Sequence, residues 1–264
     1  TPQIPLHPLR RRRLLHHRRS QRFRAMQGRM AKILVTAGPT REHIDAVRFL
    51  SNGSTGRMGY ALAAAAVAAG HDAVLVSGPT ALPCPPGVER IDVVSAREMH
   101  DRALAAFVDC DAAIGAAAVA DHRPAHPVDG KPAKEASPVT LELVPNPDVI
   151  AALAAAARAS ETRGRRRVVV GFALEAFGED SRSRGAAEER ARAKLARKQL
   201  DWIVLNRLDA LGSATNRMVL LGGEGAMVEL HEQLKDDAAR ALIAHCLAQI
   251  GPSVQVQAAS EEES

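Results

Sequence analysis

The chain has 264 residues, of which 46% are hydrophobic, so it can bury a sizeable core and is not disordered throughout. Aromatic residues make up only 3%, which predicts alanine-rich helices packed closely on a sheet of Val, Ile and Leu. The net charge of +5 belongs to the N-terminus, because residues 1–30 contain nine arginines and no acidic residue. Subtracting these nine from the 35 basic residues leaves 26, against 30 acidic residues. The body of the chain therefore lacks the basic excess of a nucleic-acid-binding domain.

Both ends are expected to lie outside the folded part. Residues 1–29 are predicted to be a disordered or mis-started Arg-rich extension, although a transit-like leader or a non-specific nucleic-acid contact has the same composition. Residues 251–264 form an acidic tail that nothing orders. No stretch approaches the ~20 apolar residues of a membrane span. The cysteines Cys84, Cys110 and Cys246 form no CxxC pair, so we expect a reducing cytoplasm and no metal site built by the protein.

A glycine-spaced loop, residues 52–59, organises the N-terminal half of the chain. The apolar residues 32–36 before it predict a buried strand, and the alanine-rich residues 60–69 after it predict a helix. Glycines at three-residue spacing let backbone N–H groups converge, and the helix adds the positive end of its dipole. This loop is therefore expected to bind an anionic group such as a phosphate.

Strands and helices alternate through the rest of the chain. Ser95 and Glu98 form a capping box that opens one of the helices. Further strands are expected at 72–77, 88–94, 111–119, 140–144, 167–173 and 202–205. Further helices are expected at 147–157, 182–199 and 231–250, and a hairpin at 218–221 and 227–230. The pattern predicts one α/β domain, residues 30–250: a Rossmann-like three-layer fold with a mainly parallel sheet, a small C-terminal hairpin, and ligands at the carboxyl ends of the strands.

Several residues near the expected strand ends are candidates for ligand binding. Asn52 has an amide that can hold a carboxylate or carbonyl oxygen, but Asn is also a common turn and N-cap residue. Asp121 follows a strand of very small residues, where a ligand-binding carboxylate is usual in open sheets, but an exposed loop Asp is also common. Phe172 ends another strand and is equally suited to the core. Each of these residues therefore has a ligand-binding interpretation and a structural one.

Lysines in two places are candidates for phosphate binding. Lys131 and Lys134 lie in the polar loop 120–138, which is long enough to be a binding loop, but loose lysines usually serve solubility. Lys194 and Lys198 are four residues apart on a predicted helix. They face a polyphosphate or simply complement the helix dipole.

Taken together, the motifs resemble phosphopantothenoylcysteine synthetase, the phosphopantothenate–cysteine ligase of coenzyme A synthesis. In bacteria this domain is commonly the C-terminal half of a bifunctional flavoprotein. The resemblance covers about residues 30–250. The segments that carry it are residues 32–42, 45–48, 51–59, 75–79, 116–121, 146–148, 170–175 and 193–198.

The resemblance implies a two-step ligation. The carboxylate of 4'-phosphopantothenate attacks the α-phosphorus of a nucleotide, CTP in most bacterial members and otherwise ATP, and pyrophosphate leaves. The amine of L-cysteine then displaces the nucleotide from the acyl-nucleotide, an acyl-cytidylate where CTP is used. Such chemistry needs positioning, lysines and Mg2+ rather than a dedicated nucleophile.

The resemblance also assigns residues by motif position. Asn52 would orient the acyl intermediate, and Lys131 would act with it as a catalytic residue. The phosphopantothenate site would comprise Gly38, Arg48, Ser54, Gly56, Gly59, Phe172 and Asn206. The nucleotide site would comprise Gly115, Ala116, Ala117, Asp121, Lys131, Pro147, Asp148, Val149, Ile150, Phe172, Lys194 and Lys198.

The sequence departs from the family pattern at two motifs. Arg57 stands where many bacterial members have lysine, so a cation is kept. Residues 131–134 hold two lysines instead of three, which predicts weaker phosphate clamping. The stretch before Met30 is too short for the flavin-dependent half, so a separate decarboxylase is expected. The resemblance further implies a homodimer, with no membrane partner and no specific nucleic-acid partner.

Three other functions compete with the ligase. A short-chain dehydrogenase has a similar glycine turn, but it needs a lysine four residues after its tyrosine, where Tyr60 is followed by Ala64. Its glycine turn also begins at the end of the first strand, which the turn at 52–59 does not. The altered lysine loop is compatible with a nucleotide sensor that has lost catalysis. Nucleic-acid binding by the arginine-rich extension would have to disappear when residues 1–29 are deleted.

Overall fold

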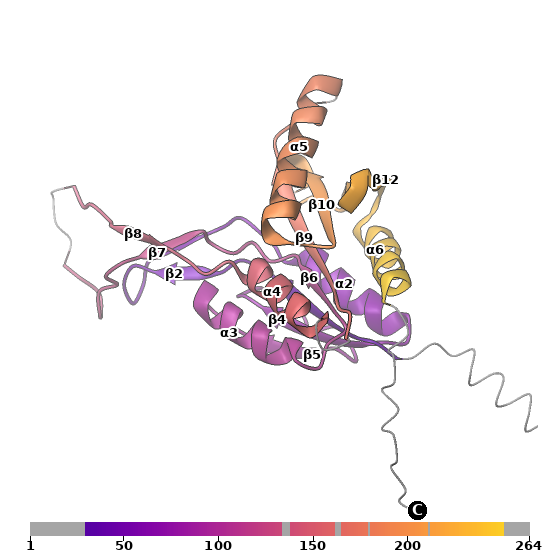
Figure 1. Ribbon diagram of the computed structural model, residues 1–264. Helices are drawn as coiled ribbons and strands as arrows, with labels where there is room; N and C mark the ends of the chain where they lie inside the picture. The colour runs from indigo at the N-terminus through magenta and orange to yellow at the C-terminus, as the bar shows by residue number, and fades with distance from the viewer. Residues whose placement is uncertain (1–29, 134–137, 162–164, 179, 211, 251–264) are drawn as a thin grey trace, which may run out of the picture. The chain divides into compact units, whose positions relative to one another are not determined.

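The computed structural model describes residues 30–133, 138–161, 165–178, 180–210 and 212–250 (Figure 1). The predicted extension 1–29, the predicted tail 251–264 and Lys134 lie outside the described residues. By its internal contacts the chain divides into two units, Thr1–Met30 and Ala31–Ser264. The second unit contains all the helices and strands described below.

An eight-stranded sheet forms the centre of this unit, in the order β12-β11-β10-β9-β6-β1-β4-β5. The six strands from β10 to β5 in this order are parallel, and β11 and β12 extend one edge as an antiparallel hairpin. The chain order of the parallel strands is that of a Rossmann fold, with the switch point between β1 and β6. The strands are β1 (Lys32–Ala37), β4 (Asp72–Ser77), β5 (Glu89–Asp92), β6 (Ala112–Gly115), β9 (Val168–Glu175), β10 (Trp202–Arg207), β11 (Thr215–Gly222) and β12 (Met227–Leu234).

Helices cover both faces of the sheet, which confirms the predicted three-layer α/β fold. On one face, α2 (Arg57–Ala68) and α6 (Lys235–Gln249) lie side by side (Figure 1). On the other lie α3 (Ala96–Phe107), α4 (Val149–Glu161) and α5 (Ser181–Lys198). Neighbouring strand residues serve opposite faces: Ile33 packs in the cluster with α2 and α6, and Leu34 packs in the cluster with α3, α4 and α5.

Local signals set the helix ends where the sequence predicts them. Ser95 Oγ accepts a hydrogen bond from the backbone N of Glu98 at 3.2 Å, which is one half of the predicted capping box. The Glu98 carboxylate accepts from the backbone N of Val94 at 2.9 Å, one residue earlier than in the standard box. Helix α5 begins at an Asp180 cap and ends at Gln199, whose φ of 54° is left-handed. A polar side chain therefore caps the N-terminus of each of these two helices, Ser95 for α3 and Asp180 for α5.

The segments outside the central sheet differ from the sequence prediction. Strands β2 (Arg41–His43) and β3 (Phe49–Ser51) form a hairpin within the loop before the glycine turn. The strand predicted at 140–144 is instead the short β8 (Leu143–Pro145), which pairs with β7 (His122–Pro124) in a separate two-stranded sheet. Figure 1 shows β2, β7 and β8 close together. The polar loop is thus part of a small hairpin region.

The last helix is also shorter than predicted. Residues 231–234 belong to β12, because β11 continues to pair with them as far as the match of Thr215 with Leu234. Pairing with a long neighbouring strand thus outweighs the helical pattern of these residues. The described residues also include two short 3₁₀ turns, Leu208–Ala210 and Gly223–Gly225. In the part of the chain that the structure describes, no helix combines the length and apolarity needed to cross a bilayer.

Candidate functional site

The glycine turn leads into the N-terminus of α2. Its N-cap residue is Gly56, with a left-handed φ of 79°, so the N-cap itself offers no side chain to the first-turn N–H groups of the helix. Thr55 Oγ1 accepts from the first of these groups, the backbone N of Arg57, at a long 3.5 Å. Ser54 Oγ accepts from the backbone N of Gly56 at 3.3 Å and so shapes the turn. Uncapped N–H groups at the positive end of a helix dipole suit an anionic ligand.

Close packing explains two of the glycines assigned from the sequence. A Cβ on Gly59 would lie 2.4 Å from the Cβ of Ala37, so α2 can rest on the end of β1 only if residue 59 has no side chain. Gly38 has a φ of 73°, and a Cβ there would lie 2.8 Å from Thr80 Cγ2. These glycines place the start of α2 over the carboxyl end of β1.

The first cavity, called the turn cavity here, lies on the α2 and α6 side of the strand ends. It has a volume of about 170 Å³. Two of its lining residues, Arg57 and Lys235, are basic, and none of the described lining residues is acidic. The lining residues are Ser54, Thr55, Gly56, Arg57, Met58, Ala116, Ala117, Ala118, Phe172, Ala173, Leu174, Asn206, Gly212, Asn216 and Lys235. A cavity with this charge suits an anion.

Lys235 is the first residue of α6. Burial, and next the positive charge of Arg57, lower the pKa of its ammonium group. An anion between the two cations would relieve their mutual repulsion. Lys235 is not among the residues predicted from the sequence to bind a ligand, because the pattern there predicts a helix that begins at residue 231 and so places Lys235 in its second turn.

The second cavity, called the strand-end cavity here, has a volume of about 250 Å³. Its charged lining residues are Asp121, Asp148 and Lys198. Its full lining is Thr36, Gly115, Ala117, Val119, Ala120, Asp121, Asn146, Pro147, Asp148, Val149, Ile150, Phe172 and Lys198. Ala117 and Phe172 line both cavities, so the two spaces meet just beyond the end of β6 and beside Phe172 within β9.

Carboxylates hold the lysines that lie near the strand-end cavity. Lys198 Nζ lies 2.8 Å from Asp148 Oδ2, and Asp148 Oδ1 accepts from the backbone N of Ala151 in α4 at 3.2 Å. Lys194 Nζ donates to Glu175 at 2.7 Å, and Arg190 Nε donates to the same carboxylate at 2.8 Å. Burial disfavours the Glu175 carboxylate, but hydrogen bonds from Lys194 and Arg190 outweigh burial and lower its pKa.

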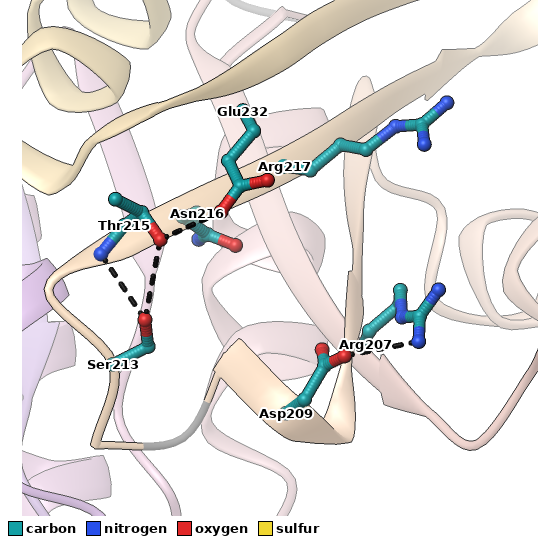
Figure 2. A pocket seen from close by; sticks show the side chains of 7 residues that line it. All are labelled: Arg207, Asp209, Ser213, Thr215, Asn216, Arg217 and Glu232. Carbon is teal, nitrogen blue, oxygen red and sulfur yellow. Dashed lines mark hydrogen bonds and ion pairs between the residues drawn. The ribbon is translucent and has the colours of Figure 1, made fainter.

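A third space is a polar hollow of about 310 Å³ beside β11 and β12 (Figure 2). Most of its polar groups pair with one another: Thr215 Oγ1 donates to Glu232 at 2.9 Å, and Arg207 lies 3.0 Å from Asp209. Ser213 Oγ accepts from the backbone N of Thr215 at 3.1 Å. The hollow shares Asn216 with the turn cavity.

Comparison with known families decides the relationship of this chain. Residues 28–250 match the model of the DNA/pantothenate metabolism flavoprotein C-terminal domain. The chain belongs to this family. The match covers both cavities and every described helix and strand.

Individual proteins similar in sequence to this chain support the same family membership. A coenzyme A biosynthesis bifunctional protein CoaBC from Vibrio vulnificus (strain YJ016) is 43% identical over 186 residues, 70% of this chain and 43% of the relative. The protein of the same name from Escherichia coli (strain K12) is 44% identical over 177 residues, 66% of this chain and 40% of the relative. The chain thus spans less than half the length of these relatives.

Solved structures give the same fold. The crystal structure of the C-terminal domain of a CoaBC protein is 33% identical, with a TM-score of 0.66 over 83% of this chain and 97% of that domain. Cab2 mutant H337A, in complex with phosphopantothenate-cysteine, is 14% identical with a TM-score of 0.60, covering 93% of this chain and 96% of the Cab2 chain. At that identity the likeness shows the fold alone.

Most residues assigned from the sequence line one of the two cavities. In the turn cavity these are Ser54, Gly56, Ala116, Ala117, Phe172 and Asn206. In the strand-end cavity these are Gly115, Ala117, Asp121, Pro147, Asp148, Val149, Ile150, Phe172 and Lys198. Among the assigned residues that line a cavity, those assigned to phosphopantothenate line the turn cavity and those assigned to the nucleotide line the strand-end cavity. The exceptions are Ala116, which lines the turn cavity, and Ala117 and Phe172, which line both.

The other assigned residues line neither cavity. Asn52 is exposed, but its Nδ2 donates to the carbonyl of Ala118 at 3.0 Å, and Ala118 lines the turn cavity. Lys131 is exposed in the hairpin region. Gly38 and Gly59 pack beneath the turn, and Lys194 is held by Glu175. Catalytic roles for Asn52 and Lys131 therefore stay predictions.

Arg48 is tied into the loop of the β2–β3 hairpin. Its Nε donates to Asp45 Oδ2 at 2.6 Å. Hydrogen bonds from the backbone N–H groups of Arg48 and Val47 hold the pKa of Asp45 below its usual range. The exposed Arg48 side chain is thus fixed in direction, and its contact with a substrate stays a prediction.

The described residues contain no group of three His, Cys, Asp or Glu side chains that could hold a metal ion. Burial raises the pKa of Cys110 to about 11 and that of Cys246 to about 12, so neither thiol is a nucleophile at neutral pH. The cavities are thus equipped with backbone N–H groups, amides, cations and carboxylates. Such groups bind and orient ligands.

Proposed function

We propose that this chain joins 4'-phosphopantothenate to L-cysteine through an acyl-nucleotide, as the ligase of coenzyme A biosynthesis. The observation that carries the proposal is that the two cavities meet at Ala117 and Phe172. One cavity has cations and no acidic lining residue, which suits the phosphate of the first substrate. The other mixes carboxylates with Lys198, which suits a nucleotide triphosphate with its metal. Membership of the pantothenate metabolism family supports this reading.

The proposed reaction begins where the cavities meet. With its phosphate at the start of α2, phosphopantothenate extends its carboxylate toward Ala117 and Phe172. A carboxylate oxygen attacks the α-phosphorus, the bond to the bridging oxygen breaks, and pyrophosphate leaves. The cysteine amine then attacks the acyl carbon, loses a proton, and releases the nucleoside monophosphate. Catalysis consists of holding these groups in line and neutralising charge.

Asn52 is the proposed residue for the second step. Its amide is anchored by the hydrogen bond to the Ala118 carbonyl, beside the turn cavity. From that position, its side chain orients the acyl carbonyl for attack by the amine. Lys131 and Lys194 are proposed to meet the nucleotide phosphates, which for Lys194 means leaving its pair with Glu175 on binding.

The nucleotide is proposed to be CTP, with ATP as the competing choice, and Mg2+ is proposed to accompany it. When bound, Mg2+ neutralises phosphate charge. Of the two carboxylates of the strand-end cavity, Asp148 pairs with Lys198, and Asp121 would offer an oxygen ligand of the kind that Mg2+ takes together with substrate phosphates.

Homodimerisation in the cytoplasm is part of the same proposal. Apolar side chains on the β2–β3 and β7–β8 hairpins are exposed, among them Val47, Phe49 and Leu143. Such side chains offer apolar area that a second copy can bury. A molar mass of twice that of the chain, measured by light scattering, would support the homodimer.

The CoaBC relatives are named as bifunctional proteins, and a decarboxylase separate from this chain stays a prediction.

Pyrophosphate release tests the proposal directly. The purified protein is assayed with 4'-phosphopantothenate, Mg2+ and either CTP or ATP, with and without cysteine, alongside Asn52→Ala. We expect turnover stimulated by cysteine with one nucleotide. Asn52→Ala should lose about 10²-fold or more in turnover and accumulate the acyl-nucleotide. Nucleotide binding without pyrophosphate release by folded protein would overturn the ligase and indicate a nucleotide sensor.

A dehydrogenase reading has less support. Tyr60 is 5% exposed, and its hydroxyl lies 3.0 Å from Ser77 Oγ and accepts from Thr80 Oγ1 at 2.9 Å. This hydroxyl belongs to a buried hydrogen-bonded chain under α2. It is poorly placed to protonate a substrate carbonyl.

A further inference from the structure

Two buried amides in the turn cavity have an unsatisfied oxygen. Asn216 is 3% exposed and Asn206 is 8% exposed. The Oδ1 atom of each is buried and has no hydrogen-bond partner among the described residues. Buried side-chain oxygens nearly always accept a hydrogen bond, because leaving water without a new partner costs stability. Two such atoms in one cavity indicate that a ligand supplies the donors.

The strand pattern aims both side chains the same way. Asn206 follows Val204 by two residues on β10, and Asn216 precedes Met218 by two residues on β11. The pairing of β11 with β12 is irregular between Asn216 and Met218, but the extra residue is on β12, and β11 keeps its alternation of buried, exposed and buried residues there. Val204 and Met218 both belong to the hydrophobic cluster under α2 and α6. Side chains two residues apart on a strand share a face. Both amides therefore point to the side of the sheet on which α2 begins, and both line the turn cavity.

A structural role for Asn216 in the neighbouring polar hollow is not supported by its contacts. In that hollow, Ser213, Thr215 and Glu232 bond to one another, and Arg207 pairs with Asp209 (Figure 2). None of these groups donates to the Asn216 oxygen. The amide thus carries the cost of burial without the hydrogen bond that would offset it.

We propose that Asn216 is a second substrate-positioning residue, which with Asn206 accepts hydrogen bonds from the central part of 4'-phosphopantothenate. This inference rests on the proposed function. That substrate carries one amide N–H and one secondary hydroxyl between its phosphate and its carboxylate, which makes two donors for two acceptors. Arg57 and Lys235 hold the phosphate in the same cavity. The amide pair fixes the chain between them and selects against phosphorylated acids that lack these donors.

The test replaces Asn216 by leucine, which has the same number and branching of side-chain heavy atoms, a larger volume and no acceptor. We expect Asn216→Leu to raise the KM for 4'-phosphopantothenate about tenfold and to leave the KM values for nucleotide and cysteine unchanged. The melting temperature without ligand should stay equal or rise, because an unsatisfied buried oxygen has been removed. The melting-temperature increase that 4'-phosphopantothenate alone gives the wild type should shrink. Arg217→Gln, on the next and exposed residue of β11, is the control.

Other outcomes would overturn the inference. A folded Asn216→Leu protein with an unchanged KM and an unchanged ligand-induced stabilisation removes the positioning role. A lower melting temperature with an unchanged KM would show a structural role only. If the leucine variant does not fold, Asn216→Ala, which also removes the acceptor, is judged by the same KM comparison. A wild type that 4'-phosphopantothenate does not stabilise would instead refute the proposed function, and this inference with it.

Discussion

The two cavities handle charge in different ways. In the turn cavity, Arg57 and Lys235 lie among neutral residues and beside uncapped N–H groups of α2, and no described lining residue is acidic. In the strand-end cavity, the lysine that lines it, Lys198, is already 2.8 Å from Asp148. The lining of the first cavity thus brings two cations and no carboxylate, whereas Lys198 of the second must leave its ion pair with Asp148 to reach a ligand.

This difference fits the two ligands of the proposed reaction. A phosphate monoester that only has to be held is best served by a fixed site whose cations repel each other without it. A triphosphate that arrives with a metal and leaves as pyrophosphate needs a site that releases its product. Ion pairs that re-form after product leaves, Lys198 with Asp148 and Lys194 with Glu175, make release easier.

The largest effect is expected from a substitution at Gly59, which should disrupt the turn cavity and leave the strand-end cavity intact. In Gly59→Val, the new side chain meets Ala37, so α2 must move off β1. We expect a loss of about 3 kcal/mol in the free energy of unfolding, as for other overpacked sites, measured by chemical denaturation. Stabilisation by 4'-phosphopantothenate should disappear, and stabilisation by nucleotide should persist.

Gly53→Ala is the matched control for this change. Gly53 lies in the same glycine turn, and an added Cβ there has no atom within 4 Å. Its unfolding free energy should stay within about 0.5 kcal/mol of the wild type. An equal loss in both variants would mean that close packing of α2 on β1 is not what the turn requires.

Removing the cation of α6 tests the charge of the turn cavity. Lys235→Met should raise the KM for 4'-phosphopantothenate about 10- to 100-fold, because a hydrogen bond to a charged group is lost. Nucleotide KM should change little. An equal rise for both substrates would show that the cavities do not divide the ligands as proposed.

The pH dependence of 4'-phosphopantothenate binding by the wild type also tests the role of the Lys235 charge. Burial and Arg57 lower the pKa of Lys235, and an anion binds the protonated form. Affinity for 4'-phosphopantothenate should therefore fall as pH rises through this lowered pKa, below the ordinary lysine value of about 10.4. The phosphate itself is fully ionised there. Lys235→Met should lose this alkaline decline, measured as the thermal shift at a series of pH values.

The smallest expected effect concerns the ion pair of the strand-end cavity. Asp148→Asn keeps an oxygen that can cap α4 but removes the charge that holds Lys198. Stability should change by less than about 1 kcal/mol, and nucleotide affinity should rise a few-fold because Lys198 is released. A large fall in nucleotide affinity that higher Mg2+ restores would instead assign Asp148 to the metal. Asp121→Asn distinguishes the two carboxylates.

Much of the fold was predictable because its signals are local. The strand at residues 72–77 follows from a short apolar run, and the start of α3 follows from Ser95 and Glu98. The hairpins β2–β3 and β7–β8 were missed or misplaced, since strands of three residues carry little periodicity. The start of α6 was misplaced because the pairing of β12 with β11 is a long-range contact.

The sequence by itself determined the α/β class and the glycine turn that leads into α2, because spacing and strand ends are local properties. It also predicted ligand-binding roles for Asp121, from its place after a strand, and for Ser54, from the family motif. Only the tertiary structure decided that the assigned residues divide between two cavities meeting at Ala117 and Phe172. It alone brought Lys235 and Asn216 to the turn cavity, because β11 and α6 fold back onto the strand ends from late in the chain.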